Sequence, residues 1–417
     1  MNHILCKGGM PLQGSVKIQG SKNAALPILA ATLMTDGICH IRNCPKISDV
    51  YSMLCLLEKL CCEVKWDLEG VRIDTRNLRK CEPCKDTFSC MRSSICLLGA
   101  LIGRERDLTI ESPGGCVIGE RPIDLHLSAL EKMGVQFTFE ESKIHAVHHG
   151  LHGTHITLPF PSVGATENVI MAATLAEGKT ILKGAAMEPE VRALCEFLNA
   201  CGAKIKGAGT DLVEVEGVRN LEAATYEIPS DRIVAGTYLL TLAGCGGNVF
   251  LQNAPTKDMK AVLEILRELG VGLELSGKGI FVQADGHVKR IPFVKTMPYP
   301  GFPTDLQSLL LTVLTVGEGE TILEETVFEN RFKVVDELRK MGACIEKIDE
   351  RKVCIKGVES LRGAGVKALE LRGGAALITA GLMAKGQTRI QGVKYIERGY
   401  ENICRDYKEL GARITSG

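Results

Sequence analysis

The chain has 417 residues, 45% of them hydrophobic, so it is long enough for two or three domains with sizeable cores. Its 50 basic and 50 acidic side chains balance, which argues against a general role in binding nucleic acid or a membrane surface. No apolar run is long enough to span a bilayer, and the first residues lack the apolar core of a signal peptide. We therefore expect a cytoplasmic protein.

The 17 cysteines indicate reduced thiols rather than a disulfide framework, because the chain is large and its cysteine number is odd. Cys81, Cys84 and Cys90 have the spacing of half a zinc site, but no second half accompanies them. We therefore expect no metal, and no cofactor either. A histidine-rich segment at 143–158 has the pattern of a hairpin, and we interpret its histidines as solvated.

In chain order, the first predicted element is a helix over residues 24–33 that is apolar nearly all round and should be buried. Lys22 and Asn23 stand at its start. A lysine at a helix start opposes the helix dipole, which is unfavourable unless an anion lies nearby.

A predicted strand at 107–111 leads into a glycine-rich loop and then into a predicted helix at 125–133. Cys116 lies at the centre of the loop, and Arg121 and Pro122 lie at its end. Unpaired N–H groups at such a helix start bind anions and lower the pKa of a neighbouring thiol. For the loop taken alone, a surface turn with an incidental thiol is the simpler interpretation, and both interpretations remain open.

The strongest organisational signal is a repeat of about 70 residues. A helical run ending in a turn recurs at Gly134, Gly202, Gly270, Gly342 and Gly411, and Cys61 has the same position in the first copy. Glycine suits the left-handed residue that ends a helix, and a strand-like run follows each copy. An apolar helix and a β-branched strand precede each copy, so six α/β units fill the chain. We interpret them as two domains with a cleft between them.

Charged residues at element starts are candidates for ligand binding. Five arginines hold such positions: Arg92, Arg121, Arg331, Arg372 and Arg398. Convergent arginines suit a small ligand rich in phosphate and carboxylate, although a surface salt bridge better explains any one of them alone. Asp231 and Asp305 precede apolar helices, where each is either an N-cap or a cavity-facing general base.

Six motifs stand in chain order: GSKNAALP at 20–27, PGGCVIGERPIDLH at 113–126, SVGAT at 162–166, FPTD at 302–305, ETVFENRF at 325–332 and RGYE at 398–401. Together they resemble the motifs of the enolpyruvyl transferases, and within that family those of the members that use UDP-N-acetylglucosamine. The resemblance covers essentially the whole chain. It implies an inside-out α/β barrel of two domains, each with three βαβαββ repeats. The domains would span 21–229 and 1–20 plus 230–417, with the active site in the cleft between them.

The resemblance also implies a reaction. The enolpyruvyl group of phosphoenolpyruvate would move to the 3′-hydroxyl of UDP-N-acetylglucosamine, with release of phosphate, through a tetrahedral ketal. This is the first committed step of peptidoglycan synthesis in bacteria. A monomer without nucleic-acid or membrane partners is expected, and the epoxide antibiotic fosfomycin would react with Cys116.

The site residues are carried over by motif. The resemblance implies four catalytic residues: Cys116, Asp305, Lys22 and Arg398. Cys116 would act as general acid, either protonating the methylene carbon or assisting release, and Asp305 would accept the proton of the sugar hydroxyl. The residues implied to bind phosphoenolpyruvate are Lys22, Asn23, Arg121, Arg331, Arg372 and Arg398. Of these, Arg331 and Arg372 would bind its carboxylate. Those implied to bind the nucleotide sugar are Asn23, Arg92, Arg121, Pro122, Ile123, Asp124, Leu125, Ser162, Val163, Gly164, Asp305 and Val327. Further candidates are Glu188, Asp231 and Glu370.

Three positions depart from the family pattern: Ser48 and Phe160 stand where lysines are common, and Glu370 stands where aspartate is usual. Two other functions remain open. The shikimate-pathway enolpyruvyl transferase shares the fold, but the Pro-Gly-Gly-Cys loop and Asn23 argue against it. The second open function is that of a non-catalytic repeat protein with a ligand-binding cleft. The intact set of Lys22, Cys116, Asp305 and Arg398 argues against this function.

Overall fold

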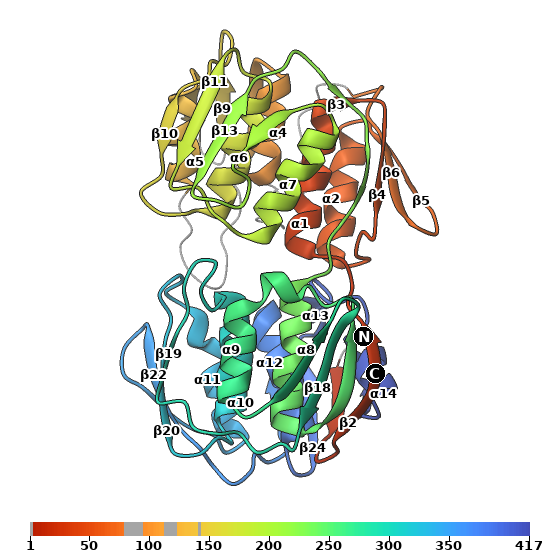
Figure 1. Cartoon of the computed structure of the whole chain (residues 1–417), viewed down its shortest axis with the longest axis vertical. Coiled ribbons are helices and arrows are strands. Elements are labelled where there is room, and N and C mark those ends of the chain that lie inside the picture. Colours follow the sequence, from red (N-terminus) through yellow and green to blue (C-terminus); the bar gives the residue numbers. More distant parts are fainter. Residues whose placement is uncertain (1–2, 79–94, 112–122, 141–142) are drawn as a thin grey trace. The chain divides into compact units, whose positions relative to one another are not determined.

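The computed structural model describes residues 3–78, 95–111, 123–140 and 143–417. The chain divides into two compact units (Figure 1). One unit holds the described residues of 20–229, and the other combines the residues up to Gln19 with Ser230–Gly417. The N-terminal strands β1 (His3–Lys7) and β2 (Leu12–Lys17) therefore belong with the C-terminal half of the chain, because they pair with strands of that half.

The unit that contains Ser230–Gly417 is built from three repeats, each a four-stranded sheet with two main helices. The first sheet has the strand order β2–β16 (Gly247–Gln252)–β18 (Gly279–Ala284)–β17 (Gly272–Ser276). The second has the order β19 (Phe293–Lys295)–β20 (Glu320–Glu324)–β22 (Lys352–Lys356)–β21 (Cys344–Lys347). The third has the order β23 (Gly365–Lys367)–β24 (Gln387–Gln391)–β1–β25 (Arg413–Ser416). The helices are α8 (Arg232–Cys245), α9 (Lys260–Glu268), α10 (Gln307–Leu314), α11 (Val334–Lys340), α12 (Leu371–Met383), the short α13 (Val393–Ile396) and α14 (Ile403–Glu409). In each sheet the first two strands are parallel and the other neighbours antiparallel, which is the βαβαββ pattern.

The unit within 20–229 follows this plan in two of its repeats, and in the described residues the third has a sheet of three antiparallel strands. Its sheets are β15 (Thr225–Glu227)–β4 (Ile38–Arg42)–β6 (Gly70–Asp74)–β5 (Glu63–Trp66), β7 (Asp107–Glu111)–β9 (Lys143–Val147)–β8 (Gln136–Glu140), β10 (His155–Thr157)–β11 (Lys179–Lys183)–β13 (Leu212–Glu216)–β12 (Lys204–Lys206), and the small pair β14 (Leu221–Glu222)–β3 (Thr35–Asp36). Its helices are α1 (Lys22–Ala31), α2 (Ser48–Lys59), α4 (Cys96–Arg104), α5 (Asp124–Glu131), α6 (Val163–Thr174) and α7 (Pro189–Ala200). The expected strand at 107–111 is confirmed.

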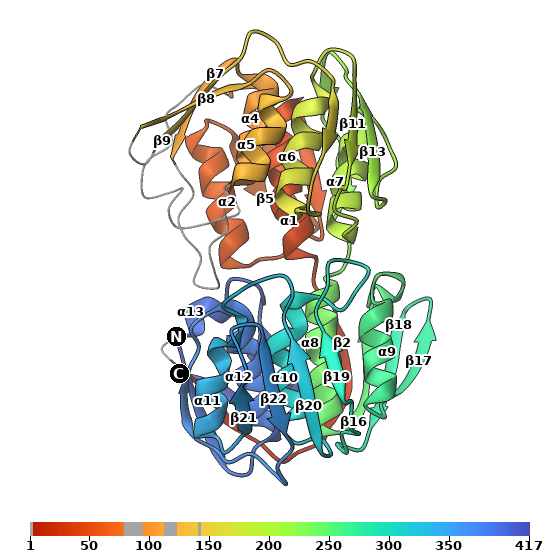
Figure 2. The same ribbon diagram turned by 90° about the vertical axis from the view of Figure 1, so that its left-hand side faces the viewer.

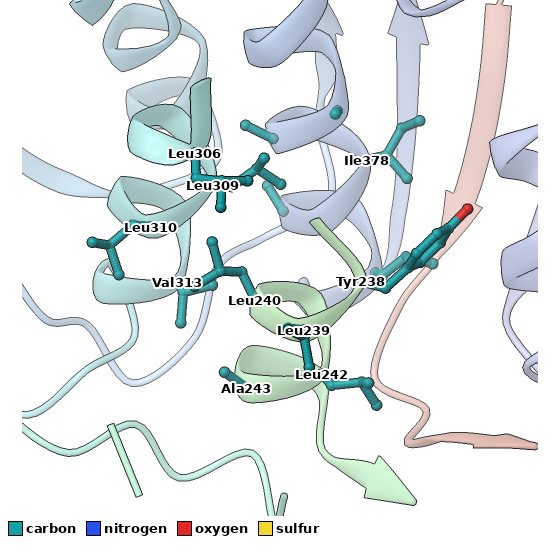
Figure 3. Close-up of a cluster of buried hydrophobic side chains, with 14 of the residues drawn as sticks. Tyr238, Leu239, Leu240, Leu242, Ala243, Leu306, Leu309, Leu310, Val313 and Ile378 are labelled. Atoms are coloured by element: carbon teal, nitrogen blue, oxygen red, sulfur yellow. The ribbon is translucent and has the colours of Figure 1, made fainter. Parts of the chain in front are cut away.

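The first helix of each repeat is buried, and the sheets lie outside the helices (Figures 1 and 2). Every residue of α10 is buried, and the apolar run 24–31 of α1 is buried as expected. The second helix buries one face only, as α9 does with Val262, Leu263 and Leu266. Each unit has its own hydrophobic core, and Figure 3 shows α8, α10 and α12 meeting in one of them. The fold is therefore the expected inside-out α/β barrel.

The turn that ends the second helix needs a left-handed residue. Gly202 and Gly342 have φ values of +101° and +91° there. In the first repeat Cys61 adopts φ +65° at the same place, although a side chain disfavours this conformation. The repeat therefore keeps the backbone turn even where the glycine is replaced.

Two sequence expectations about smaller features have clear outcomes. No disulfide joins the cysteines of the described residues. The hairpin expected at 143–158 is wrong, because β9 pairs with β7 and β8 while β10 belongs to another sheet, beside β11. His148 is also buried rather than solvated, and its Nε2 lies 3.0 Å from the Ile102 carbonyl. In the described ranges, no helix is both long and apolar enough to cross a membrane.

Candidate active site

Asp305, Arg331 and Arg372 form an ion cluster in the unit that contains Ser230–Gly417. Arg331 Nη2 lies 2.6 Å from Asp305 Oδ1, and Arg372 Nη2 lies 3.0 Å from Asp305 Oδ2. The two guanidinium side chains are 2% and 4% exposed, whereas the Asp305 carboxylate is 25% exposed. The structure therefore brings together three residues that the sequence singled out separately, and it leaves the carboxylate accessible.

Each of these three residues lies at or just before the start of a helix. Asp305 lies in a 3-10 turn, Thr304–Leu306, that leads directly into the buried α10. Arg331 opens a second 3-10 turn, Arg331–Lys333, ahead of α11, and Arg372 is the second residue of α12. All three thus stand at helix starts, and the helices that follow Asp305 and contain Arg372 are buried.

Glu325 organises the loops around the cluster, and its role was not predicted from the sequence. Its buried carboxylate accepts hydrogen bonds from Thr304 Oγ1 (2.8 Å), Val327 N (2.8 Å) and Phe328 N (3.0 Å). The carboxylate thereby joins the turn that carries Asp305 to the loop that carries Val327. The arginine at the end of this loop, Arg331, has its guanidinium 5.2 Å from the centre of the Phe328 ring.

The two candidate acids Glu370 and Asp231 are helix caps. Glu370 accepts hydrogen bonds from the N–H groups of Arg372 (2.7 Å) and Gly373 at the start of α12, and it lies 3.9 Å from Arg331 Nη1. Asp231 accepts hydrogen bonds from Ile233 N (2.8 Å) and Val234 N (3.0 Å) at the start of α8. Asp231 is therefore the N-cap of α8. Asp305 does not cap its 3-10 turn, where Pro303 has the cap position, and its carboxylate pairs with Arg331 and Arg372.

Two buried N–H donors of the cluster suit an anionic ligand. Burial alone would lower the pKa of Arg372, but the charge of Asp305, with Tyr400 and Asp231, outweighs burial and holds this pKa above its usual range. Within the described part of the chain, Arg331 Nε and Arg372 Nη1 are buried without a hydrogen-bond partner. Leaving such a buried donor unsatisfied is unfavourable by about 1–3 kcal/mol. A carboxylate or phosphate between the two guanidinium groups would satisfy these donors.

Arg398 lies in the turn after α13, half-buried, in the same unit. Gln19 holds this turn at two points: its side-chain amide donates to the Gly399 carbonyl (3.2 Å), and its side-chain oxygen accepts from Glu401 N (2.9 Å). The first 19 residues thus help to fix the segment that carries Arg398, a link that the sequence alone did not indicate.

In the other unit, Lys22 is the first residue of α1, behind the N-cap Ser21. Its Nζ lies 3.1 Å from the carboxylate of Asp49, which is buried in α2. The nearby anion that a lysine at a helix start requires is therefore Asp49 within the protein itself. Asn23, also in the first turn of α1, is half-buried.

The starts of α5 and α6 carry the remaining described candidates. Ile123, Asp124 and Leu125 open α5, and Ser162 caps α6 ahead of Val163 and Gly164. Asn168, which the sequence did not single out, ties these starts together: it lies 2.7 Å from the His126 ring and accepts a hydrogen bond from Gly99 N at 2.6 Å. A Cβ on Gly164 would lie 2.8 Å from the His126 ring, so only glycine lets the two helix starts approach this closely.

The remaining candidates from the sequence lie away from these clusters or outside the described residues. Glu188 directly precedes α7 and is half-buried, while Phe160 is 42% exposed and Ser48 is exposed at the start of α2. Arg92, Cys116, Arg121 and Pro122 lie outside the described residues, as do Cys81, Cys84 and Cys90. Among the residues that the structure describes, no group of three or more His, Cys, Asp or Glu side chains is arranged to hold a metal ion.

Glu167 in α6 gives a prediction about pH and stability. Burial raises the pKa of this carboxyl from 4.5 to about 8, with the Cys96 thiol hydrogen bond opposing and Glu190 and Glu188 adding to the rise. Above a pH of about 4.5 the unfolded chain releases a proton that the folded chain retains, so this group lowers stability by about 1.4 kcal/mol per pH unit until about pH 8. Urea unfolding of Glu167→Gln should therefore show a stability advantage over the unmodified protein that grows from about pH 5 to about pH 8.

The exposed Glu196 in α7 supplies the control for this prediction. The difference in stability between Glu196→Gln and the unmodified protein should be the same at about pH 5 and at about pH 8. If the Glu167→Gln difference were equally independent of pH, the carboxyl would not be protonated in the folded state.

Comparison with known proteins shows the family to which the chain belongs. The chain matches the family described as EPSP synthase (3-phosphoshikimate 1-carboxyvinyltransferase) over residues 6–406. It is 45% identical to the UDP-N-acetylglucosamine 1-carboxyvinyltransferase of Clostridium botulinum, covering 100% of both chains. It is 44% identical to UDP-N-acetylglucosamine 1-carboxyvinyltransferase 2 of Caldanaerobacter subterraneus subsp. tengcongensis, covering 100% of this chain and 99% of that one.

Solved structures support the fold. The enolpyruvyl transferase NikO from Streptomyces tendae has a TM-score of 0.89 at 21% identity, covering 99% of this chain and 98% of its own. An EPSP synthase from Acinetobacter baumannii has a TM-score of 0.76 at 19% identity, covering 100% of this chain and 99% of its own. At these identities the likeness confirms the inside-out α/β architecture.

Proposed function

The chain belongs to the enolpyruvyl transferase family that includes the UDP-N-acetylglucosamine 1-carboxyvinyltransferases, and on this premise we propose that it catalyses their reaction. It transfers the enolpyruvyl group of phosphoenolpyruvate to the 3′-hydroxyl of UDP-N-acetylglucosamine and releases phosphate. The reaction serves peptidoglycan synthesis. The observation that carries the proposal is the cluster of Asp305, Arg331 and Arg372, in which two buried guanidinium groups surround one accessible carboxylate.

The cluster suits both halves of this chemistry. The N–H groups at Arg331 Nε and Arg372 Nη1, without partners among the described residues, are donors for the phosphoenolpyruvate carboxylate. Asp305, held as an anion between two positive charges, accepts the proton of the attacking hydroxyl. Fixed positive charges in a buried site also stabilise the negative charge of the substrate through the transition state.

The remaining roles come from the motifs. Lys22, Arg121 and Arg398 bind the phosphate of phosphoenolpyruvate. Cys116 delivers a proton to the methylene carbon while the sugar oxygen bonds to the adjacent carbon, which gives the tetrahedral ketal. Loss of phosphate and of a methyl proton then restores the double bond. The nucleotide sugar contacts Asn23, Arg92 and Val327 with the starts of α5 and α6, where Asn168 fixes Ile123–Leu125 and Ser162–Gly164.

The finer organisation is part of the same proposal. Domains of 21–229 and 1–20 plus 230–417 contribute residues to one active site, and the Cys116 loop closes over it. The enzyme works as a cytoplasmic monomer. Candidate residues of both units stand at helix starts, which supports a role for each unit in the site.

An assay that offers two acceptors tests the proposal. With phosphoenolpyruvate present, phosphate release is measured with UDP-N-acetylglucosamine and, separately, with shikimate 3-phosphate. We expect turnover with the nucleotide sugar only, and preincubation with fosfomycin should stop it by alkylating Cys116. Turnover with shikimate 3-phosphate alone would assign the chain to the shikimate-pathway enzymes, and no phosphate release with either acceptor would favour a non-catalytic binding protein.

A further inference from the structure

Glu325 is a fully buried acid that directly follows β20 in the unit that contains Ser230–Gly417. A carboxylate removed from water is unfavourable unless hydrogen bonds or a cation satisfy it. The three groups that donate to Glu325 are one hydroxyl and two backbone N–H groups, none of which is charged. No step assigned to the proposed reaction uses this carboxylate, so its burial requires an explanation of its own.

The two oxygens of the Glu325 carboxylate hold two different segments. Oε2 accepts from Thr304 Oγ1 at 2.8 Å, and Thr304 directly precedes the proposed general base Asp305. Oε1 accepts from Val327 N at 2.8 Å and from Phe328 N at 3.0 Å, in the loop to which the nucleotide sugar is proposed to bind. One side chain therefore sets the distance between the turn that carries the base and the loop that carries the sugar contact.

The position of Glu325 is itself fixed by backbone hydrogen bonds. Its N–H group donates to the Arg351 carbonyl at 2.8 Å. The next residue, Thr326, is bonded twice to the buried Thr296: its N–H group donates to Thr296 Oγ1 at 3.0 Å, and its hydroxyl donates to the Thr296 carbonyl at 2.6 Å. Thr296 directly follows β19, the strand beside β20. Through Glu325, both segments are thus anchored to the ends of two neighbouring strands.

We propose that Glu325 is a positioning residue for Asp305, because it sets the distance between this general base and the 3′-hydroxyl of a nucleotide sugar bound at Val327. The inference rests on the proposed function, which supplies both the base and the hydroxyl. A displacement of about 1 Å at the reacting groups can lower a rate about 100-fold, so the length of this connection matters for catalysis. Glu325 itself takes no part in proton transfer.

Glu325→Gln and Glu325→Asp separate the effect of length from that of charge. Glutamine keeps the length: its amide oxygen can accept from Val327 N and Phe328 N, and its amide nitrogen can donate to Thr304 Oγ1. Aspartate keeps the charge but is one methylene shorter, so it cannot reach both segments. We expect Glu325→Asp to lower kcat/KM for UDP-N-acetylglucosamine at least about tenfold, whereas Glu325→Gln should stay within about threefold of the unmodified protein.

Thr304→Val and Thr304→Ser test the connection to Asp305 alone, and they decide the question if Glu325→Asp does not fold. Valine removes the hydroxyl that donates to Glu325, whereas serine keeps it, and both leave the bonds to Val327 N and Phe328 N in place. Thr304→Val should therefore lower kcat about tenfold and change the KM for UDP-N-acetylglucosamine less than about threefold. Thr304→Ser should keep kcat within about threefold of the unmodified protein.

Glu320, at the other end of β20, supplies the control because its side chain is 59% exposed. Glu320→Gln and Glu320→Asp should each leave kcat/KM unchanged. The inference would be overturned if kcat/KM for Glu325→Asp equalled or exceeded that for Glu325→Gln, or if Thr304→Val and Thr304→Ser had the same kcat. With an active unmodified protein, these results would leave the proposed function standing. An inactive unmodified protein would instead refute the proposed function.

Discussion

Asp305→Asn should reduce phosphate release by about three orders of magnitude while both substrates still bind, in the range expected for loss of a positioned general base. The amide keeps the volume of the carboxylate and one acceptor oxygen, so it can accept a hydrogen bond from Arg331, now 2.6 Å from Oδ1, or from Arg372, now 3.0 Å from Oδ2, but not from both. It cannot accept the proton of the sugar hydroxyl. Single-turnover phosphate release together with equilibrium binding of UDP-N-acetylglucosamine separates the loss of chemistry from any loss of binding.

Asp336→Asn is the control for this prediction. Asp336 lies in α11 of the same unit, is 61% exposed, and pairs with Arg339 and Lys347. Its replacement should change the rate less than about twofold and stability by less than about 0.5 kcal/mol, as for a surface substitution. If Asp305→Asn kept a rate within tenfold of the unmodified protein, the proton of the hydroxyl would have to leave to another group.

The fold was largely predictable because its signals are local and repeated six times. Apolar helices, their glycine turns and the strands after them recur at a constant spacing, and each repeat supports the interpretation of the others. Cys61, at φ +65°, shows that the turn persists without its usual residue. The failure at 143–158 has a physical cause: alternation predicts strands, but it does not say which sheet each strand joins. β9 and β10 are neighbours in sequence and belong to different sheets.

The site was predictable only in part, because its geometry is not local. Each of Asp305, Arg331 and Arg372 has an ordinary explanation where it stands in the sequence. Their shared position at element starts grouped the two arginines, and only the family resemblance added Asp305 to them. Their convergence depends on two repeats packing so that the start of α12 lies beside the turn before α10. The supporting residues were missed for the same reason. Glu325 follows a strand like a surface acid, yet it is buried and accepts three hydrogen bonds from two loops.

Arg331→Lys should lower kcat/KM for phosphoenolpyruvate about 100-fold, mainly through KM, although the charge is conserved. The guanidinium reaches Asp305 at 2.6 Å and Glu370 at 3.9 Å, packs on the Phe328 ring and keeps Nε without a partner among the described residues. An ammonium group has a single nitrogen and no planar fork, so it cannot hold Asp305 and bind a substrate carboxylate in the same geometry. Steady-state kinetics with phosphoenolpyruvate varied at saturating UDP-N-acetylglucosamine measure the effect.

Two further variants show whether shape or charge is lost. Arg339→Lys is the control: this side chain is 42% exposed, and its replacement should leave kcat/KM for phosphoenolpyruvate unchanged. If Arg331→Lys also left kcat/KM unchanged, the proposed binding of the substrate carboxylate by Arg331 would be contradicted. Arg331→Met removes one of the two buried guanidinium groups that pair with Asp305 in the described residues, so it should destabilise the protein by about 3–5 kcal/mol. Arg331→Lys keeps the cation and should destabilise much less. A large kinetic loss in a stable lysine variant would thus separate the binding role of the guanidinium from its structural role as a counter-charge.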